Sequence, residues 1–233
     1  MKPELRFIVN LRWFLSSYDG LKTDFPILPK RDLMSTVFTH PAIPLAIGLG
    51  INAGLLSSKS RSSTVPFRLL LLGCLFSVLP DLDVIGFELG VSYWSSYGHR
   101  GFTHSIFFAI VCGLTMMHWS QWLGASKKTV FLFLSISMMS HGFLDSMTYG
   151  GLGVAFFWPF DTTGEFMQWR PLPVSPIGID RFFNRWGAYV IKTEFRLIWI
   201  PAMAVVIVAT FAGWLFAVIR KFRKTRSSQS GPH

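Results

Sequence analysis

The chain alternates between long apolar runs and shorter polar segments. Most of these runs approach the ~20 residues that a helix needs to cross the hydrocarbon core of a bilayer. The runs cover residues 39–56, 67–80, 104–123, 129–147 and 197–219. The second run is short, and it resumes at 84–87 after a polar interruption. The pattern predicts an all-α fold, a polytopic membrane helical bundle of about five transmembrane helices.

Composition agrees with a membrane location. Apolar residues make up 51% of the 233 residues and charged residues only 15%, which is too apolar for an ordinary soluble domain. The lipid bilayer is therefore the first expected partner. Cys74 and Cys112 both lie within apolar runs, so we expect neither a disulfide framework nor a thiolate zinc site.

Positive charge is concentrated in a few segments between or after the apolar runs. The formal net charge is +10, and ten of the 22 Lys and Arg residues fall in the segments 57–68, 124–128 and 220–226, none of which contains an acid. By the positive-inside rule these segments are cytoplasmic, and the C-terminus with them. Because the clustering is a topology signal, we expect no specifically bound nucleic acid.

Three regions are expected along the chain. Residues 1–33 form an N-terminal extension with a short basic, aromatic stretch that suits a bilayer interface but is too charged to span. Residues 34–219 form the membrane-embedded domain, and residues 220–233 form a basic cytoplasmic tail. Within the domain, residues 148–195 are expected to form a long extracytoplasmic loop before the last helix, folded as a cap because it is rich in aromatic residues.

A dense set of polar groups precedes the third apolar run. Residues 98–105 read Gly-His-Arg-Gly-Phe-Thr-His-Ser, which places the imidazoles of His99 and His104 close to the guanidinium of Arg100. Residues five apart do not share one helix face. A loop that turns into a helix near His104 can still aim both rings at one point.

Other acids and imidazoles also lie at the ends of apolar runs. Asp81 and Asp83 end the second run, where an ionisable group is costly and usually functional or paired. His141 and Asp145 are four residues apart in the fourth run. They share a helix face, which suits two ligands of one metal or a carboxylate that orients an imidazole. His40 lies near the start of the first run.

Counting back from a cytoplasmic C-terminus through five spans places all of these run ends on the extracytoplasmic face. A cluster of histidines and aspartates on one face predicts a site for one or two divalent metal ions. Zinc suits the histidine-rich set, and manganese and iron stay open. The candidate metal ligands are His40, Asp81, His99, His104, His141 and Asp145.

Candidate catalytic roles fall to three residues. Arg100 is the expected clamp for an anionic substrate group, and Asp83 or Asp145 is the expected base. His118 lies deep in the third run, near a basic segment. We expect it to pack and hydrogen-bond rather than to bind metal.

The ordered motifs resemble those of the YdjM family, bacterial inner-membrane proteins described as predicted metal-dependent hydrolases. The resemblance covers roughly Met34 to Ile219 and is carried by Thr39-His40-Pro41, Pro80-Asp81-Leu82-Asp83, His99-Arg100-Gly101-Phe102-Thr103-His104-Ser105 and Ser140-His141-Gly142-Phe143-Leu144-Asp145. It implies a multi-pass inner-membrane hydrolase, distantly similar to zinc-dependent phospholipase C and the nucleases related to it. The implied substrate is a small-molecule or lipid phosphoester reached from the outer face of the inner membrane.

Two other functions stay open. A metal-free histidine phosphatase would use a His-x-x-x-Asp pair such as His141 and Asp145, although Ser140 stands where that class has an arginine. A non-enzymatic metal-binding or transport protein would use the same cluster. A transport site lies near the bilayer midplane, whereas these residues lie at run ends, which favours hydrolysis.

Overall fold

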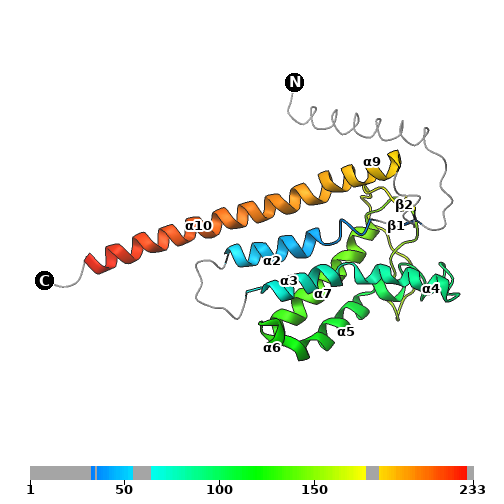
Figure 1. The fold of residues 1–233 in the computed structure, drawn as a ribbon, viewed down its shortest axis with the longest axis horizontal. Helices are drawn as coiled ribbons and strands as arrows, with labels where there is room; N and C mark the ends of the chain where they lie inside the picture. The colour runs from blue at the N-terminus through cyan, green and yellow to red at the C-terminus, as the bar shows by residue number, and fades with distance from the viewer. Residues whose placement is uncertain (1–32, 35, 55–63, 177–183, 230–233) are drawn as a thin grey trace, which may run out of the picture.

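The computed structural model describes residues 33–34, 36–54, 64–176 and 184–229 (Figure 1). The expected N-terminal extension lies outside the described residues, apart from its last residue. Helices dominate the described part, so the expected all-α fold is confirmed. The strands there are β1 (Leu33–Met34) and β2 (Ser175–Pro176), which pair antiparallel.

Helix α7 (Lys127–Ser146) is the centre of the bundle. It packs against α2 (Ala42–Gly54), α3 (Phe67–Phe76) and α5 (Ile106–Met116). Buried apolar side chains of α7, among them Phe133, fill the core between these helices.

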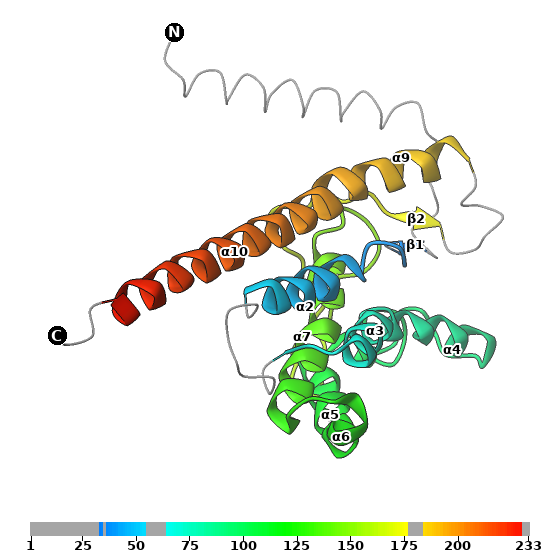
Figure 2. The same ribbon diagram turned by 60° about the vertical axis from the view of Figure 1, so that its left-hand side comes forward.

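The last helical segment runs along α2. Helix α9 (Arg185–Glu194), the π-helical turn η6 (Phe195–Trp199) and α10 (Ile200–Gln229) follow one another without a break. Helix α10 lies beside α2 in both views (Figure 1 and Figure 2). A second apolar cluster, which includes Leu144 and Ile198, joins α7 to this pair.

Short helical segments flank α3 and α5. η3 (Leu79–Val84) and α4 (Ile85–Glu88) follow α3, and η4 (Phe102–His104) precedes α5. η5 (Met117–Trp119) and α6 (Ser120–Leu123) extend α5 to the end of the third apolar run.

Local sequence explains where α5 and α7 begin. The Ser105 side chain accepts a hydrogen bond from the backbone N–H of Phe108 at 3.0 Å, and the Ser126 side chain accepts one from Thr129 at 3.1 Å. Each serine thereby satisfies a donor that the first turn leaves unpaired. Gly124 adopts φ 70° between α6 and α7, a left-handed conformation that favours glycine.

Fewer helices than expected are long and apolar enough to cross a bilayer. Among the described residues two qualify, Ile106–Leu123 and Arg185–Lys221, or three if α3 and the η3–α4 segment, bent by 42°, form one span. Helix α2 has only 13 residues, and α7 buries serine, histidine and aspartate side chains. Among the described residues, two or three segments thus have the length and composition of a span, rather than the expected five or so, because short or broken helices are tolerated where protein surrounds them.

The loop before the last helix is shorter than expected. Helix α9 begins at Arg185, where the Asn184 side chain accepts a backbone N–H of the first turn at 3.0 Å. The expected loop through residue 195 therefore ends earlier, because an N-cap starts the helix there. Within residues 148–176, a bridge between Val154 and Glu165 folds the chain back on itself.

Several helices have one terminus next to a basic segment. Where they are described, these termini lie together at one end of the bundle. Arg68 Nη1 donates a hydrogen bond to the Trp122 carbonyl at 3.0 Å. At the far end of α2, a Cβ added to Gly213 of α10 would lie 2.2 Å from the Ala53 carbonyl oxygen. The polar motifs lie at the opposite ends of the same helices.

Candidate metal centre

Four segments that are far apart in the sequence meet at one end of the bundle. They are the turn before α2, the η3 segment, the loop that leads into α5 and the C-terminal half of α7. They bring together the residues singled out from the sequence: His40, Asp81, Asp83, His99, Arg100, His104, His141 and Asp145. Their metal-binding and catalytic roles stay predictions.

His141 is oriented by a backbone carbonyl. Its Nδ1 lies 2.7 Å from the carbonyl oxygen of Ser77. A carbonyl oxygen only accepts, so Nδ1 carries the proton and donates it. In the neutral ring Nε2 then holds a lone pair, and this is the form in which an imidazole binds a metal.

His104 points its ring at His141. The two Nε2 atoms lie 3.0 Å apart, although His104 enters from η4 and His141 from α7. On the other side of the His104 ring, Nδ1 lies 3.0 Å from the Thr103 hydroxyl and 3.4 Å from Asp83 Oδ2. Both rings are thus held from their Nδ1 side with Nε2 directed to a shared point.

Two carboxylates face the same point. Asp81 Oδ1 lies 3.4 Å from His141 Nε2 and 3.9 Å from His104 Nε2. Asp145 Oδ2 lies 3.4 Å from His104 Nε2 and 3.7 Å from His141 Nε2. All four side chains are almost fully buried.

This set of donors fits a divalent cation. One ligand atom from each of Asp81, His104, His141 and Asp145 lies within 4.8 Å of the others. Buried carboxylates are costly unless positive charge or hydrogen bonds compensate them. Both carboxylate oxygens of Asp81 accept no hydrogen bond of normal geometry from the described residues. Imidazole nitrogens mixed with carboxylate oxygens suit zinc, and they also suit manganese or iron.

Asp83 holds a second group of ligand atoms. Its Oδ1 lies 2.9 Å from His99 Nδ1, and its Oδ2 accepts a hydrogen bond from Thr103 at 3.0 Å. Asp83, His99 and His104 together offer ligand atoms within 4.8 Å of one another. A carboxylate on Nδ1 fixes the ring and leaves Nε2 to a metal, as in many carboxylate–histidine pairs. The expected role of Asp83 as a base stays a prediction.

His40 completes the cluster from the turn before α2. Its Nε2 lies 3.8 Å from both Asp81 Oδ2 and Asp145 Oδ1. Its ring stacks on that of His141 with centroids 3.8 Å apart. His40 is thus within reach of both carboxylates.

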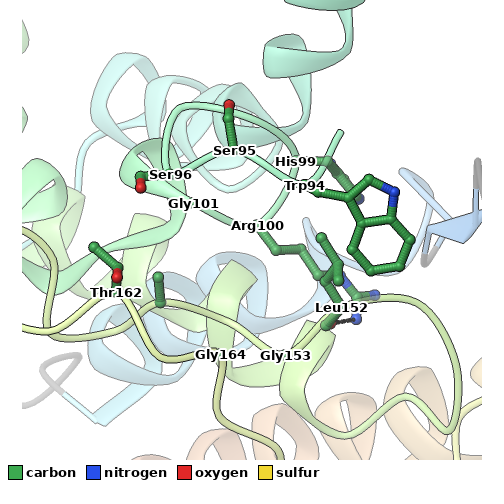
Figure 3. Close-up of a pocket in the computed structure, with 11 residues that line it drawn as sticks. Trp94, Ser95, Ser96, His99, Arg100, Gly101, Leu152, Gly153, Thr162 and Gly164 are labelled. Carbon is green, nitrogen blue, oxygen red and sulfur yellow. Dashed lines mark hydrogen bonds between the residues drawn. The ribbon is translucent and has the colours of Figure 1, made fainter. Parts of the chain in front are cut away.

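Arg100 is buried, and part of its guanidinium contacts other groups of the protein. Its backbone adopts φ 64°, a left-handed conformation uncommon for a residue with a side chain and frequent at functional sites. Nε lies 3.1 Å from Asp145 Oδ2, and Nη1 donates to the Leu152 carbonyl at 2.6 Å (Figure 3). Arg100 and His99 also line a polar cavity of about 310 Å³. The role of Arg100 as a substrate clamp stays a prediction, since much of its guanidinium faces Asp145 and the 148–176 segment.

Sequence reasoning did not single out Glu194. This buried side chain of α9 accepts hydrogen bonds from the hydroxyls of Thr36 and Thr39 and from the Thr36 backbone N–H. It thereby ties α9 to the turn that carries His40. An acid in an otherwise apolar and basic stretch was the only available signal, and nothing in the sequence indicated its partners.

His118 lies outside the His/Asp groups of the described residues. Its Nδ1 lies 3.0 Å from the Thr115 carbonyl, and its ring contacts Trp119 edge to face. These contacts agree with the packing role that the sequence suggests.

These features define a helical membrane protein with a buried His/Asp cluster at one end of its bundle. The sequence model described as YdjM inner membrane protein matches residues 34–223. The inner membrane protein YbcI of Escherichia coli (strain K12) is 40% identical over 171 residues, which cover 73% of this chain and 94% of the relative. The chain therefore belongs to the YdjM family of bacterial inner membrane proteins, as its motifs indicate. No solved structure matches it.

Proposed function

We propose that this chain is a metal-dependent hydrolase of the inner membrane that acts on phosphoesters. The observation that carries the proposal is the convergence of His104 and His141 Nε2 atoms, 3.0 Å apart, with the buried carboxylates of Asp81 and Asp145. A structural role alone would pair each polar group by a normal hydrogen bond, whereas both Asp81 oxygens accept none from the described residues and face imidazole nitrogens 3.4–3.9 Å away.

Asp81, His104, His141 and Asp145 would hold one divalent ion, and His99 and His40 are further candidate ligands for that ion or for a second one. The chemistry that a divalent ion supplies when bound is Lewis-acid polarisation of a phosphoryl oxygen and acidification of a water molecule. The protein's own contribution is orientation, through the Ser77 carbonyl on His141 and through Asp83 on His99.

The polar cavity beside the cluster supports an anionic substrate. It is lined by His99, Arg100 and Ser96 and by backbone of the 148–176 segment. Arg100 Nη2 has no hydrogen-bond partner among the described residues, so one edge of the guanidinium is available to a phosphate oxygen. Asp83 and Asp145 are the candidate bases; Asp83 contacts His99, and Asp145 contacts Arg100.

We place the cluster at the extracytoplasmic face and the C-terminus in the cytoplasm. Arg68 and the end of α6 lie together at the opposite end of the bundle from the cluster, and the basic segments at that end carry the positive-inside signal. A site at the end of the bundle, rather than at its middle, suits hydrolysis better than transport.

The test is to measure metal content and hydrolysis on one preparation. Detergent-purified protein and a His99→Ala, His141→Ala double variant are analysed by inductively coupled plasma mass spectrometry and assayed with bis(p-nitrophenyl) phosphate. We expect one or two zinc, manganese or iron ions per chain and phosphodiesterase activity, both lost in the double variant. Metal without hydrolysis of any phosphoester would leave a metal-binding protein, and a metal-free wild type after reconstitution would overturn the metal site.

A further inference from the structure

An apolar groove opens beside the metal-ligand candidate His104 and shares no lining residue with the polar cavity. It has a volume of about 500 Å³, and eight of its ten lining residues are apolar. His104 lies in its wall, together with Ile136, Met139 and Phe143 of α7. The size falls within the range of about 300–1,000 Å³ that is typical of small-molecule sites.

The groove is continuous with the surface that meets lipid. Ile136 and Phe143 are 44% and 48% exposed on α7, and Phe157 is 57% exposed on the neighbouring segment. In a water-soluble protein such a patch would mark a binding surface. In an inner membrane protein, apolar side chains exposed on a membrane helix meet acyl chains.

The polar cavity touches the cluster at different residues from the groove. His99 and Arg100 line the cavity, whereas His104 lines the groove. The rings of His99 and His104 are only 5.3 Å apart between centroids. A molecule with a polar, anionic part and an apolar chain could therefore occupy both spaces, with its junction at the His/Asp cluster.

We propose that the groove binds an acyl chain of a bilayer glycerophospholipid, and that the lipid's phosphate lies against the cluster with its headgroup in the polar cavity. The assignment of this lipid as substrate rests on the hydrolase function proposed above. Binding of the chain by the groove stands on the geometry alone.

Lipid occupancy is measured by photo-crosslinking. Wild-type protein in nanodiscs of phosphatidylethanolamine and phosphatidylglycerol receives increasing amounts of a phosphatidylethanolamine with a diazirine near the end of one acyl chain. Adducts are mapped by mass spectrometry. We expect adducts within 136–143 that saturate with probe concentration, whereas adducts on the exposed face of α10 increase in proportion to it, because bulk lipid contacts do not saturate.

Filling the groove supplies the matched comparison. Ile136→Trp places a large ring in the groove, and Leu132→Trp places the same ring one turn earlier on α7, at a position that is 43% exposed and does not line the groove. Ile136→Phe is the milder variant should the tryptophan impair folding. We expect the saturable adducts to disappear in Ile136→Trp and to persist in Leu132→Trp.

Measurements of hydrolysis distinguish the proposed lipid groove from the proposed hydrolase function. Ile136→Trp should lower release of headgroup from nanodisc lipid by about tenfold, because a blocked chain site removes binding energy that the transition state uses. The ratio of its lipid hydrolysis to its hydrolysis of soluble bis(p-nitrophenyl) phosphate should fall by a similar factor, whereas Leu132→Trp, outside the groove, should keep the wild-type rates on both substrates and the wild-type metal content. Equal lipid hydrolysis and equal adducts in both tryptophan variants would overturn the groove proposal while the hydrolase stands. Saturable groove adducts without hydrolysis of either substrate would overturn the hydrolase and keep the lipid site.

Discussion

The Nε2 atoms of His104 and His141 lie 3.0 Å apart, each ring being held from its other nitrogen. Because the Nδ1–H of His141 donates a hydrogen bond to the Ser77 carbonyl, the neutral ring directs its Nε2 lone pair at His104. Two imidazoles arranged in this way, beside two buried carboxylates, can both bind the same cation.

Removing a ligand from this group should remove the metal. We expect His104→Ala and Asp145→Ala to lose bound metal and activity while still inserting into the membrane, because each lies within the group that offers ligand atoms within 4.8 Å. His118→Ala is the control, since that ring contacts only its own helical segment among the interactions described. Metal content measured by mass spectrometry tests whether these residues bind metal. Undiminished metal in both site variants would contradict the assignment.

Asp83 should act on metal affinity through His99. Asp83→Asn weakens the contact between Oδ1 and His99 Nδ1, now 2.9 Å, and we expect about 10- to 100-fold weaker metal binding, as is typical of such supporting carboxylates. Saturating metal should restore the full stoichiometry. Competition with a fluorescent chelator measures the affinity, and Glu88→Gln, an exposed acid on α4, is the matched charge control. Equal affinities in the two variants would argue against an orienting role for Asp83.

Gly101 should tolerate no side chain. A Cβ there would lie 2.3 Å from the Ser96 carbonyl oxygen, so the loop that carries His99 and Arg100 would have to shift. We expect Gly101→Ala to lower the free energy of unfolding by about 1–3 kcal/mol, as overpacking does, and to weaken metal binding. Thermal unfolding in detergent measures the change. Gly54→Ala is the control, because nothing lies within 4 Å of its Cβ position, and a similar loss there would show that the effect is not local.

Glu194 should stabilise the turn before α2. We expect Glu194→Ala to cost about 1–3 kcal/mol, since it leaves buried hydroxyls of Thr36 and Thr39 without their acceptor. Glu194→Gln should cost less, because its amide oxygen still accepts. A double-mutant cycle with Thr39→Val, followed by thermal unfolding, tests the contact directly. Additive losses would mean that the two side chains do not interact.

Membrane orientation can be measured with single cysteines. In a background with Cys74 and Cys112 replaced by serine, we expect Thr163→Cys to react with a membrane-impermeant maleimide once the outer membrane is permeabilised. Lys127→Cys should react only after the inner membrane is lysed, because the positive-inside rule predicts that the basic start of α7 lies on the cytoplasmic side. Both side chains are exposed, so access through protein does not limit labelling. The reverse pattern would move the cluster to the cytoplasmic face.

Part of the site could be read from local spacing. His141 and Asp145 share a face because a helix repeats every 3.6 residues, and Ser105 starts a helix because its side chain caps the first turn. The lengths and boundaries of the helices were predicted less well from the sequence. The 13-residue length of α2 depends on how neighbouring segments bury it. The start of the last helix at Arg185 follows the Asn184 N-cap, a local signal that the sequence analysis did not use.

The chain alone determined the helical membrane class, the family and the residues that could bind metal, because apolar run length, basic flanks and motif spacing are properties of the linear sequence. Tertiary structure decided which atoms of those residues face one another. The carbonyl that orients His141 comes from Ser77, 64 residues away, and the carboxylate that fixes the turn of His40 comes from Glu194, 155 residues from Thr39. Such pairings arise only when packed helices bring distant segments together and leave their buried polar groups no partner but each other.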